Sequence, residues 1–128
     1  MRLTQHVMSM GTCNYGLCSI EMHFDGQRLS RALELLLSAA GPIRAKVGCR
    51  CCRVESDAKD GRAVRYTEEW ASRGAMENNI RSADFWRILL ALDLCDEEPH
   101  VMIGDVTAST GMEALQMLRS KQGEQPPA

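Results

Sequence analysis

An α+β domain with one four-stranded antiparallel sheet is the fold that this sequence predicts. Residues 18–24 and 62–70 alternate apolar and polar side chains with the period of two that is typical of a half-buried strand. Over 29–40 and 85–92, apolar residues recur at three and four residues, which is the spacing of an amphipathic helix. The resulting order of strand, helix, strand, strand, helix pair and strand is the split βαβ pattern of ferredoxin-like domains.

The composition is that of one globular domain. The chain has 128 residues, of which 45% are hydrophobic and 25% charged, and this length suffices for one core. A net charge of -2 without a basic excess argues against nucleic acid as a partner. No run approaches the roughly 18 apolar residues of a membrane span, and no export signal is recognisable. We therefore expect no membrane partner, a cytoplasmic location and six reduced cysteines.

The pattern divides the chain into three parts. Residues 1–17 show neither helical nor alternating order and are predicted to be an N-terminal extension that is a candidate for disorder. Residues 18–110 hold all the strands and helices of the predicted domain, and 111–128 read as a short helix followed by a polar tail. Within the domain, Asp25 is placed to cap the first helix, and Gly41-Pro42 is expected to end it.

The middle of the chain predicts a hairpin. A second strand is expected over 44–55, where Gly48 allows a kink, and Asp60-Gly61 forms the turn into the third strand. Three large side chains then share one face of that strand: Val64, Tyr66 and Trp70. Ser72 is placed to cap a short helix, and the fourth strand is expected over 101–108.

Apolar residues of both parities indicate that the sheet is buried on two sides. The pairs Cys51-Cys52 and Met102-Ile103 put apolar side chains on both faces, whereas the helices can cover only one. A second copy of the chain could cover the other face. We therefore predict a homodimer in which two sheets face each other.

A run of polar and aromatic residues after the third strand carries a family resemblance. Glu68, Glu69 and Trp70 lead into a Ser72-Arg73 turn, within the segment EEWASRGAMENNIRSADFWRILLAL. This segment resembles the antibiotic biosynthesis monooxygenase domain family, and the similarity covers Ile20 to about Met112. The resemblance implies a dimeric α/β barrel that inserts oxygen into a small aromatic or quinol substrate. It also implies that no metal, flavin or other cofactor takes part, because the deprotonated substrate supplies the electron to dioxygen.

Six side chains could serve such chemistry. His23 is a candidate base, and Asn79 is a neutral hydrogen-bond donor at a position where similar quinol monooxygenases often carry histidine. The other four would shape the substrate pocket or stabilise an anion: Trp70, Phe85, Arg81 and Arg87. Structural roles compete with these, since Trp70 could be a core anchor, Asn79 a helix-ending residue and His23 a solvent-facing one.

The cysteine cluster has a spacing that also occurs in redox and zinc sites. Cys49, Cys51 and Cys52 lie beside two arginines, which could lower a thiol pKa. A zinc site needs a second pair of ligands, however, and Cys49 and Cys52 should point to opposite faces of a regular strand. We therefore favour thiols that line a cavity over a metal site or a disulfide.

Two functions of different classes follow from these observations. The first is a cofactor-independent monooxygenase-like protein, and the second is a noncatalytic small-molecule-binding or sensing homodimer on the same scaffold. Asn79 separates the two, because the first requires that an amide can replace an imidazole in the pocket. Haem degradation ranks below both, since the helix offers no histidine to ligate iron.

Overall fold

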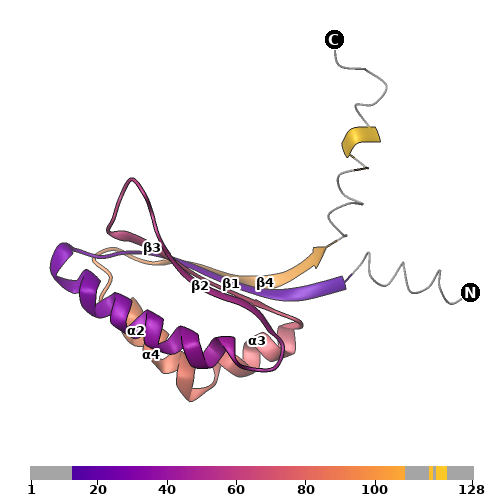
Figure 1. Cartoon of the computed structure of the whole chain (residues 1–128), viewed down its shortest axis with the longest axis horizontal. Helices are drawn as coiled ribbons and strands as arrows, with labels where there is room; N and C mark the ends of the chain where they lie inside the picture. Colours follow the sequence, from indigo (N-terminus) through magenta and orange to yellow (C-terminus); the bar gives the residue numbers. More distant parts are fainter. Residues whose placement is uncertain (1–12, 109–115, 117, 121–128) are drawn as a thin grey trace, which may run out of the picture. The chain divides into compact units, whose positions relative to one another are not determined.

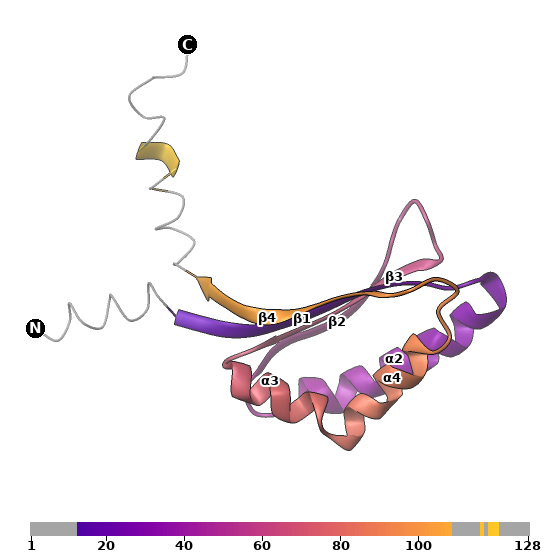
Figure 2. The same cartoon turned by 180° about the vertical axis from the view of Figure 1, so that it is seen from behind.

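The fold is one sheet with helices packed on a single face (Figures 1 and 2). The computed structural model describes residues 13–108, 116 and 118–120. In chain order the elements are β1 (Cys13–His23), α2 (Gly26–Arg44), β2 (Cys49–Ser56), β3 (Ala63–Trp70), α3 (Arg73–Ile80), the 3-10 helix η1 (Ala83–Phe85), α4 (Trp86–Leu92) and β4 (His100–Ala108). Among these residues, no helix combines the length and apolar character needed to cross a membrane.

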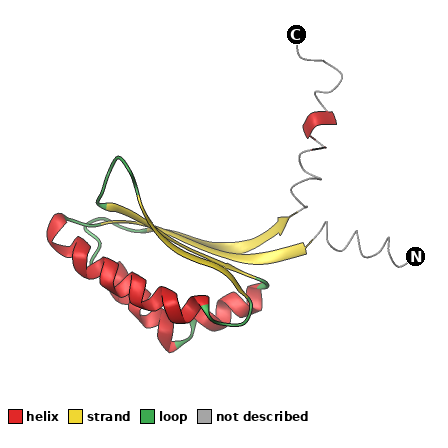
Figure 3. Ribbon diagram, viewed as in Figure 1, coloured by secondary structure: helices red, strands yellow, loops and turns green. Residues whose placement is uncertain are grey.

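The sheet has the predicted ferredoxin-like arrangement. Its strands lie in the order β2-β3-β1-β4, so that the two hairpin strands β2 and β3 are followed by the N-terminal strand. β3 runs antiparallel to both of its neighbours. Figure 3 shows α2, α3 and α4 in one layer against one face of the sheet. The predicted α+β class, the element order and the one-sided helical layer are thereby confirmed.

The core lies between the sheet and the helices. Large side chains from β1 and β3 point into it at alternate positions, as their sequence pattern predicts. The fully buried large side chains of the core, from strands and helices together, include Ile20, Phe24, Leu36, Ile43, Tyr66, Trp70, Met76 and Ile88.

Helix α2 begins as predicted but does not end as predicted. The Asp25 side chain accepts hydrogen bonds from the Gln27 and Arg28 amides, which confirms it as the cap. The prediction that Gly41-Pro42 ends the helix was wrong, because α2 continues to Arg44. Pro42 has no N–H for the Ser38 carbonyl, but Arg87 of α4 donates to that carbonyl at 3.1 Å. A tertiary contact thus replaces the missing helical bond.

Two strand boundaries also differ from the prediction. β1 begins at Cys13 rather than Cys18, and Gly16 already pairs with Trp70 of β3. β2 begins at Cys49 rather than at residue 44, because α2 continues to Arg44 and the chain then turns over 45–48, where Gly48 takes a positive φ of 90°. Residues 1–12 and most of the predicted C-terminal helix and tail lie outside the described residues.

A bulge in β2 changes the direction of the cysteines. Cys49 is opposite Trp70 and Cys52 is opposite Glu68, with a register shift between Cys49 and Cys51. Since Trp70 and Glu68 are two residues apart on β3, both cysteines face the same side of the sheet. The prediction that Cys49 and Cys52 point to opposite faces was therefore wrong.

Helix α3 lies very close to the sheet. Ser72 caps it as predicted, by accepting a hydrogen bond from the Ala75 amide at 3.1 Å. A Cβ at Gly16 of β1 would lie 3.0 Å from the Met76 Cβ and the Ser72 carbonyl oxygen, so any larger residue here would force α3 away from the sheet by a few tenths of an ångström. The close approach brings the end of α3 directly over the inner face of β3.

Candidate functional site

A carboxyl group is buried in the core beneath α3. Glu68 of β3 has 0% of its surface exposed, and the hydrogen-bond donors to its carboxyl group are all side chains. Trp70 Nε1 donates to Glu68 Oε1 at 2.8 Å, and Asn79 Nδ2 lies 3.1 Å from both carboxyl oxygens. The Tyr66 hydroxyl donates to Oε2. We call these four residues, Tyr66, Glu68, Trp70 and Asn79, the Glu68 network.

The network reaches the surface through Lys46. The Lys46 Nζ donates to Asn79 Oδ1 at 2.8 Å and to Ser82 Oγ at 2.9 Å, and it lies 3.2 Å from Asp84 Oδ2. Lys46 therefore fixes the orientation of the Asn79 amide, since an oxygen facing the ammonium leaves the NH₂ group facing Glu68. A continuous polar path connects the buried carboxyl to a half-buried ion pair.

Burial dominates the ionisation of this site. It raises the pKa of Glu68 above its ordinary range, although the bonds from Tyr66, Trp70 and Asn79 and the charge of Lys46 act in the opposite direction. Burial and the adjacent carboxyl also raise the pKa of Tyr66, which keeps the phenol protonated. A carboxyl with a raised pKa next to polar donors can accept or hold a proton at a defined atom.

The cysteines of the core are not activated. Burial raises the pKa of Cys18 to about 12 and that of Cys52 to about 11, with a further contribution from the charge of Glu68. Cys52 Sγ contacts the Tyr66 hydroxyl at 3.4 Å. Thiols with such pKa values remain protonated, and a protonated thiol is a poor nucleophile. They act here as small apolar packing groups.

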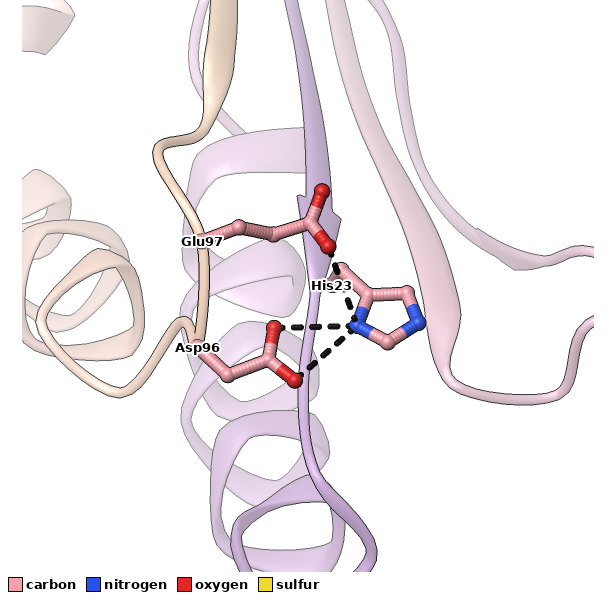
Figure 4. Close-up of side chains that lie close together, drawn as sticks. All are labelled: His23, Asp96 and Glu97. Atoms are coloured by element: carbon pink, nitrogen blue, oxygen red, sulfur yellow. Dashed lines mark hydrogen bonds and ion pairs between the residues drawn. The ribbon is translucent and has the colours of Figure 1, made fainter.

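The two predicted catalytic residues do not lie together. Asn79 bonds to Glu68, two residues from the Trp70 end of β3, whereas His23 pairs with Ala63 at the other end of that strand. The residues from 63 to 70 span roughly 23 Å of strand. His23 instead contacts Asp96 at 2.9 Å, and this hydrogen bond raises the pKa of the imidazole (Figure 4).

The predicted pocket residues divide in the same way. Trp70 and Phe85 are buried, with Trp70 bonded to Glu68 and Phe85 packed in the core. Arg81 is exposed and lies 3.8 Å from Glu77, and Arg87 donates to the Ser38 carbonyl. The structure thus brings Trp70 and Asn79 together and places both arginines in surface contacts.

A hollow of about 310 Å³ opens elsewhere on the molecule. It lies where the β2–β3 hairpin meets β1, and its lining includes Glu21, Glu55, Asp57 and Arg65. Arg65 and Glu21, which are paired residues of β3 and β1, form a 3.0 Å ion pair in its lining. This polar, open hollow is separate from the Glu68 network, which is fully packed.

Glu68 and Lys46 are the functional candidates that sequence reasoning missed. The signal for Glu68 was present, because it has the same parity as Tyr66 and Trp70 and so must share their buried face. Lys46 gave no such signal, since it lies in the turn between α2 and β2 and reaches Asn79 only through tertiary structure.

The sheet order and helical layer define a ferredoxin-like α+β protein, and comparison with solved structures makes the fold more specific. No protein-family model and no curated protein matches the sequence. A structure described as an antibiotic biosynthesis monooxygenase is similar at a TM-score of 0.64 and 17% identity, covering 71% of this chain and 97% of that one.

Two further structures extend the similarity. A candidate antibiotic biosynthesis monooxygenase from Deinococcus radiodurans has a TM-score of 0.64 at 19% identity, covering 75% of this chain and 94% of that chain. One from Nitrosomonas europaea has a TM-score of 0.65 at 12% identity, covering 73% and 89%. The chain therefore has the antibiotic biosynthesis monooxygenase fold, which confirms the expected resemblance at the level of structure.

Proposed function

We propose that this chain is a cofactor-independent monooxygenase-like protein that oxidises a small aromatic or quinol substrate with dioxygen. The observation that carries the proposal is the Glu68 network, a carboxyl with a raised pKa held between an indole and an amide donor. The monooxygenase-like fold supports it. In this proposal the entering substrate displaces Asn79 from Glu68 and opens the packed network. Glu68 then accepts the phenolic proton, Trp70 forms a wall against the ring, and the freed Asn79 amide donates to the substrate oxygen.

The reaction needs little from the protein beyond proton transfer and exclusion of water. Loss of the phenolic proton makes the ring electron-rich enough to reduce dioxygen by one electron. The substrate radical and the superoxide that result then combine at a ring carbon to form a peroxide. Loss of water from the peroxide leaves a quinone, so one oxygen atom enters the product and the other leaves as water. A dry, apolar site favours these steps because it protects the reactive intermediate from solvent.

We also propose that the protein works as a homodimer. Helices α2, α3 and α4 all lie on one face of the sheet, and β4 exposes three consecutive apolar side chains, Val101, Met102 and Ile103. An exposed apolar edge strand favours association with another surface.

The test is oxygen consumption by the purified, metal-free protein with a panel of hydroquinones and polyphenols. We expect turnover by the wild type, a loss of at least about tenfold in Glu68→Gln, and little change in Glu69→Gln. Glu69 is the matched control, because it is the next carboxyl along the strand and faces the other side. If Glu68→Gln fails to fold, Tyr66→Phe is the second variant. It keeps the aromatic ring in the core and removes only the hydroxyl that donates to Glu68.

Two results would contradict the proposal: an inactive wild type across the panel, or equal turnover in both glutamine variants. Asn79→His adds a third comparison. Activity that appears only in this variant would mean that an imidazole is required and that the present chain is not an oxygenase.

A noncatalytic, small-molecule-binding or sensing homodimer is the second candidate. Its specific support is the packing of the Glu68 network, where Trp70 is only 1% exposed, together with the separate open hollow at the hairpin. If this candidate holds, aromatic ligands should bind without oxygen consumption, and Arg65→Ala should weaken binding whereas Glu68→Gln should not.

A further inference from the structure

His23 is the centre of a group of carboxylates that the proposed oxygenase chemistry does not use. Asp96 and Glu97 face one ring nitrogen of His23, as Figure 4 shows, and Asp60 faces the other. The three carboxylates come from two separate segments, the hairpin turn and the loop before β4. We propose that His23, Asp96 and Glu97 bind a divalent transition-metal ion, with Asp60 orienting the imidazole.

The ligand atoms are spaced for a single ion. His23 Nδ1 lies 2.9 Å and 3.1 Å from the Asp96 carboxyl oxygens and 3.8 Å from Glu97 Oε2, and one ligand atom from each residue lies within 4.8 Å of the others. Ligands bound at about 2.1 Å on adjacent positions of a metal are about 3 Å apart. Glu97 is well exposed and can close the remaining distance by rotation of its side chain.

Asp60 orients the imidazole ring of His23 for metal binding. Its Oδ2 lies 3.3 Å from His23 Nε2, so the Nε2–H can donate to Asp60 while Nδ1 presents its lone pair to the ion. Metal-binding histidines usually donate their second ring N–H to a carboxylate in this way. Metal binding displaces the proton that Nδ1 otherwise shares with Asp96 and releases it to solvent.

Backbone bonds hold these groups in place before any ion binds. The Asp96 amide donates to the His23 carbonyl at 3.0 Å, and Asp60 accepts from the Arg62 amide through Oδ1 and from the Ala63 amide through its carbonyl. Within the described part of the chain, no lysine or arginine forms an ion pair with Asp60, Asp96 or Glu97. The excess negative charge favours a cation, and one imidazole nitrogen with two carboxylates suits a divalent first-row ion such as Mn²⁺, which favours carboxylate ligands.

The test is titration of the purified protein with Mn²⁺. Binding is measured as the loss of the free Mn²⁺ signal in electron paramagnetic resonance. Mn²⁺ is the probe because it prefers oxygen and imidazole to thiolate, so the cysteines do not compete. We expect one ion per chain in the wild type, loss of binding in His23→Gln and Asp96→Asn, and about 10- to 100-fold weaker binding in Asp60→Asn. Glu34→Gln, an exposed carboxylate on α2, is the charge-matched control and should bind as the wild type does.

A second readout separates binding from misfolding. Mn²⁺ should raise the melting temperature of the wild type and of Glu34→Gln, because the ion links the end of β1 to the loop before β4. It should leave the melting temperatures of folded His23→Gln and Asp96→Asn unchanged. The proposal is overturned if the wild type takes up no Mn²⁺, or if the affinity is the same in His23→Gln and Asp96→Asn as in Glu34→Gln.

Discussion

The raised pKa of Glu68 makes the stability of the folded chain depend on pH. Below about 4.5, its ordinary value, the carboxyl is protonated in both the folded and the unfolded chain. As the pH rises above this value, the unfolded chain loses the proton first and the folded chain keeps it. Stability that Glu68 contributes at low pH is therefore lost as the pH rises through the folded-state pKa.

This dependence can be isolated by comparison with Glu68→Gln, which cannot ionise. The difference in unfolding free energy between wild type and variant should be most favourable to the wild type near pH 4.5 and decrease at higher pH. The decrease should be about 1.4 kcal/mol for each unit by which folding raises the pKa. Urea unfolding from pH 4 to 8 measures it, with Glu69→Gln as control. A difference that stays constant or grows with pH would contradict the assignment.

The residue scale also shows where sequence reasoning succeeded and where it could not. The sequence predicts Trp70 and Asn79 as site residues, and the parity of the strand adds Glu68, because alternation determines which face a side chain takes. The meeting of His23 with Asp60 and Asp96 could not be predicted. It depends on the register of β1 against β3 and on the course of the loop before β4, and neither follows from local periodicity.

At the scale of elements, the contact between Arg87 and α2 explains why a proline is tolerated near the end of a helix. Arg87→Ala removes the donor to the Ser38 carbonyl and should lower the unfolding free energy by about 0.5 to 1.5 kcal/mol. In a Pro42→Ala background the same change should cost less, because the new amide N–H can bond to Ser38.

This coupling is measured by a double-mutant cycle in urea, with Arg81→Ala, an exposed arginine next to Glu77, as the control. Equal costs in both backgrounds would mean that Arg87 does not compensate for the proline. The contact of Arg87 with the Ser38 carbonyl is also the reason that the end of α2 was mispredicted. Gly-Pro is a strong local stop signal, and only a side chain 45 positions further along the sequence (Pro42 to Arg87) overrides it.

At the scale of the whole molecule, the open sheet face and the apolar edge at β4 bear on assembly. Burying Val101 and Ile103 against a second copy would remove apolar surface that is now 47% and 46% exposed. A charge at these positions would have to be desolvated in an interface, whereas in a monomer it would be well solvated. The double variant Val101→Asp/Ile103→Asp should therefore shift a dimer towards monomer.

Sedimentation equilibrium across a range of protein concentrations checks this, with Val47→Asp as the matched control. Val47 is a comparably apolar residue in the turn after α2, where it is 98% exposed and its replacement leaves the sheet untouched. We expect a dimer for the wild type and for Val47→Asp, and at least about a hundredfold weaker association for the double variant. A monomeric wild type would remove the dimer from the proposal, while an unchanged dimer in the double variant would place the interface away from β4.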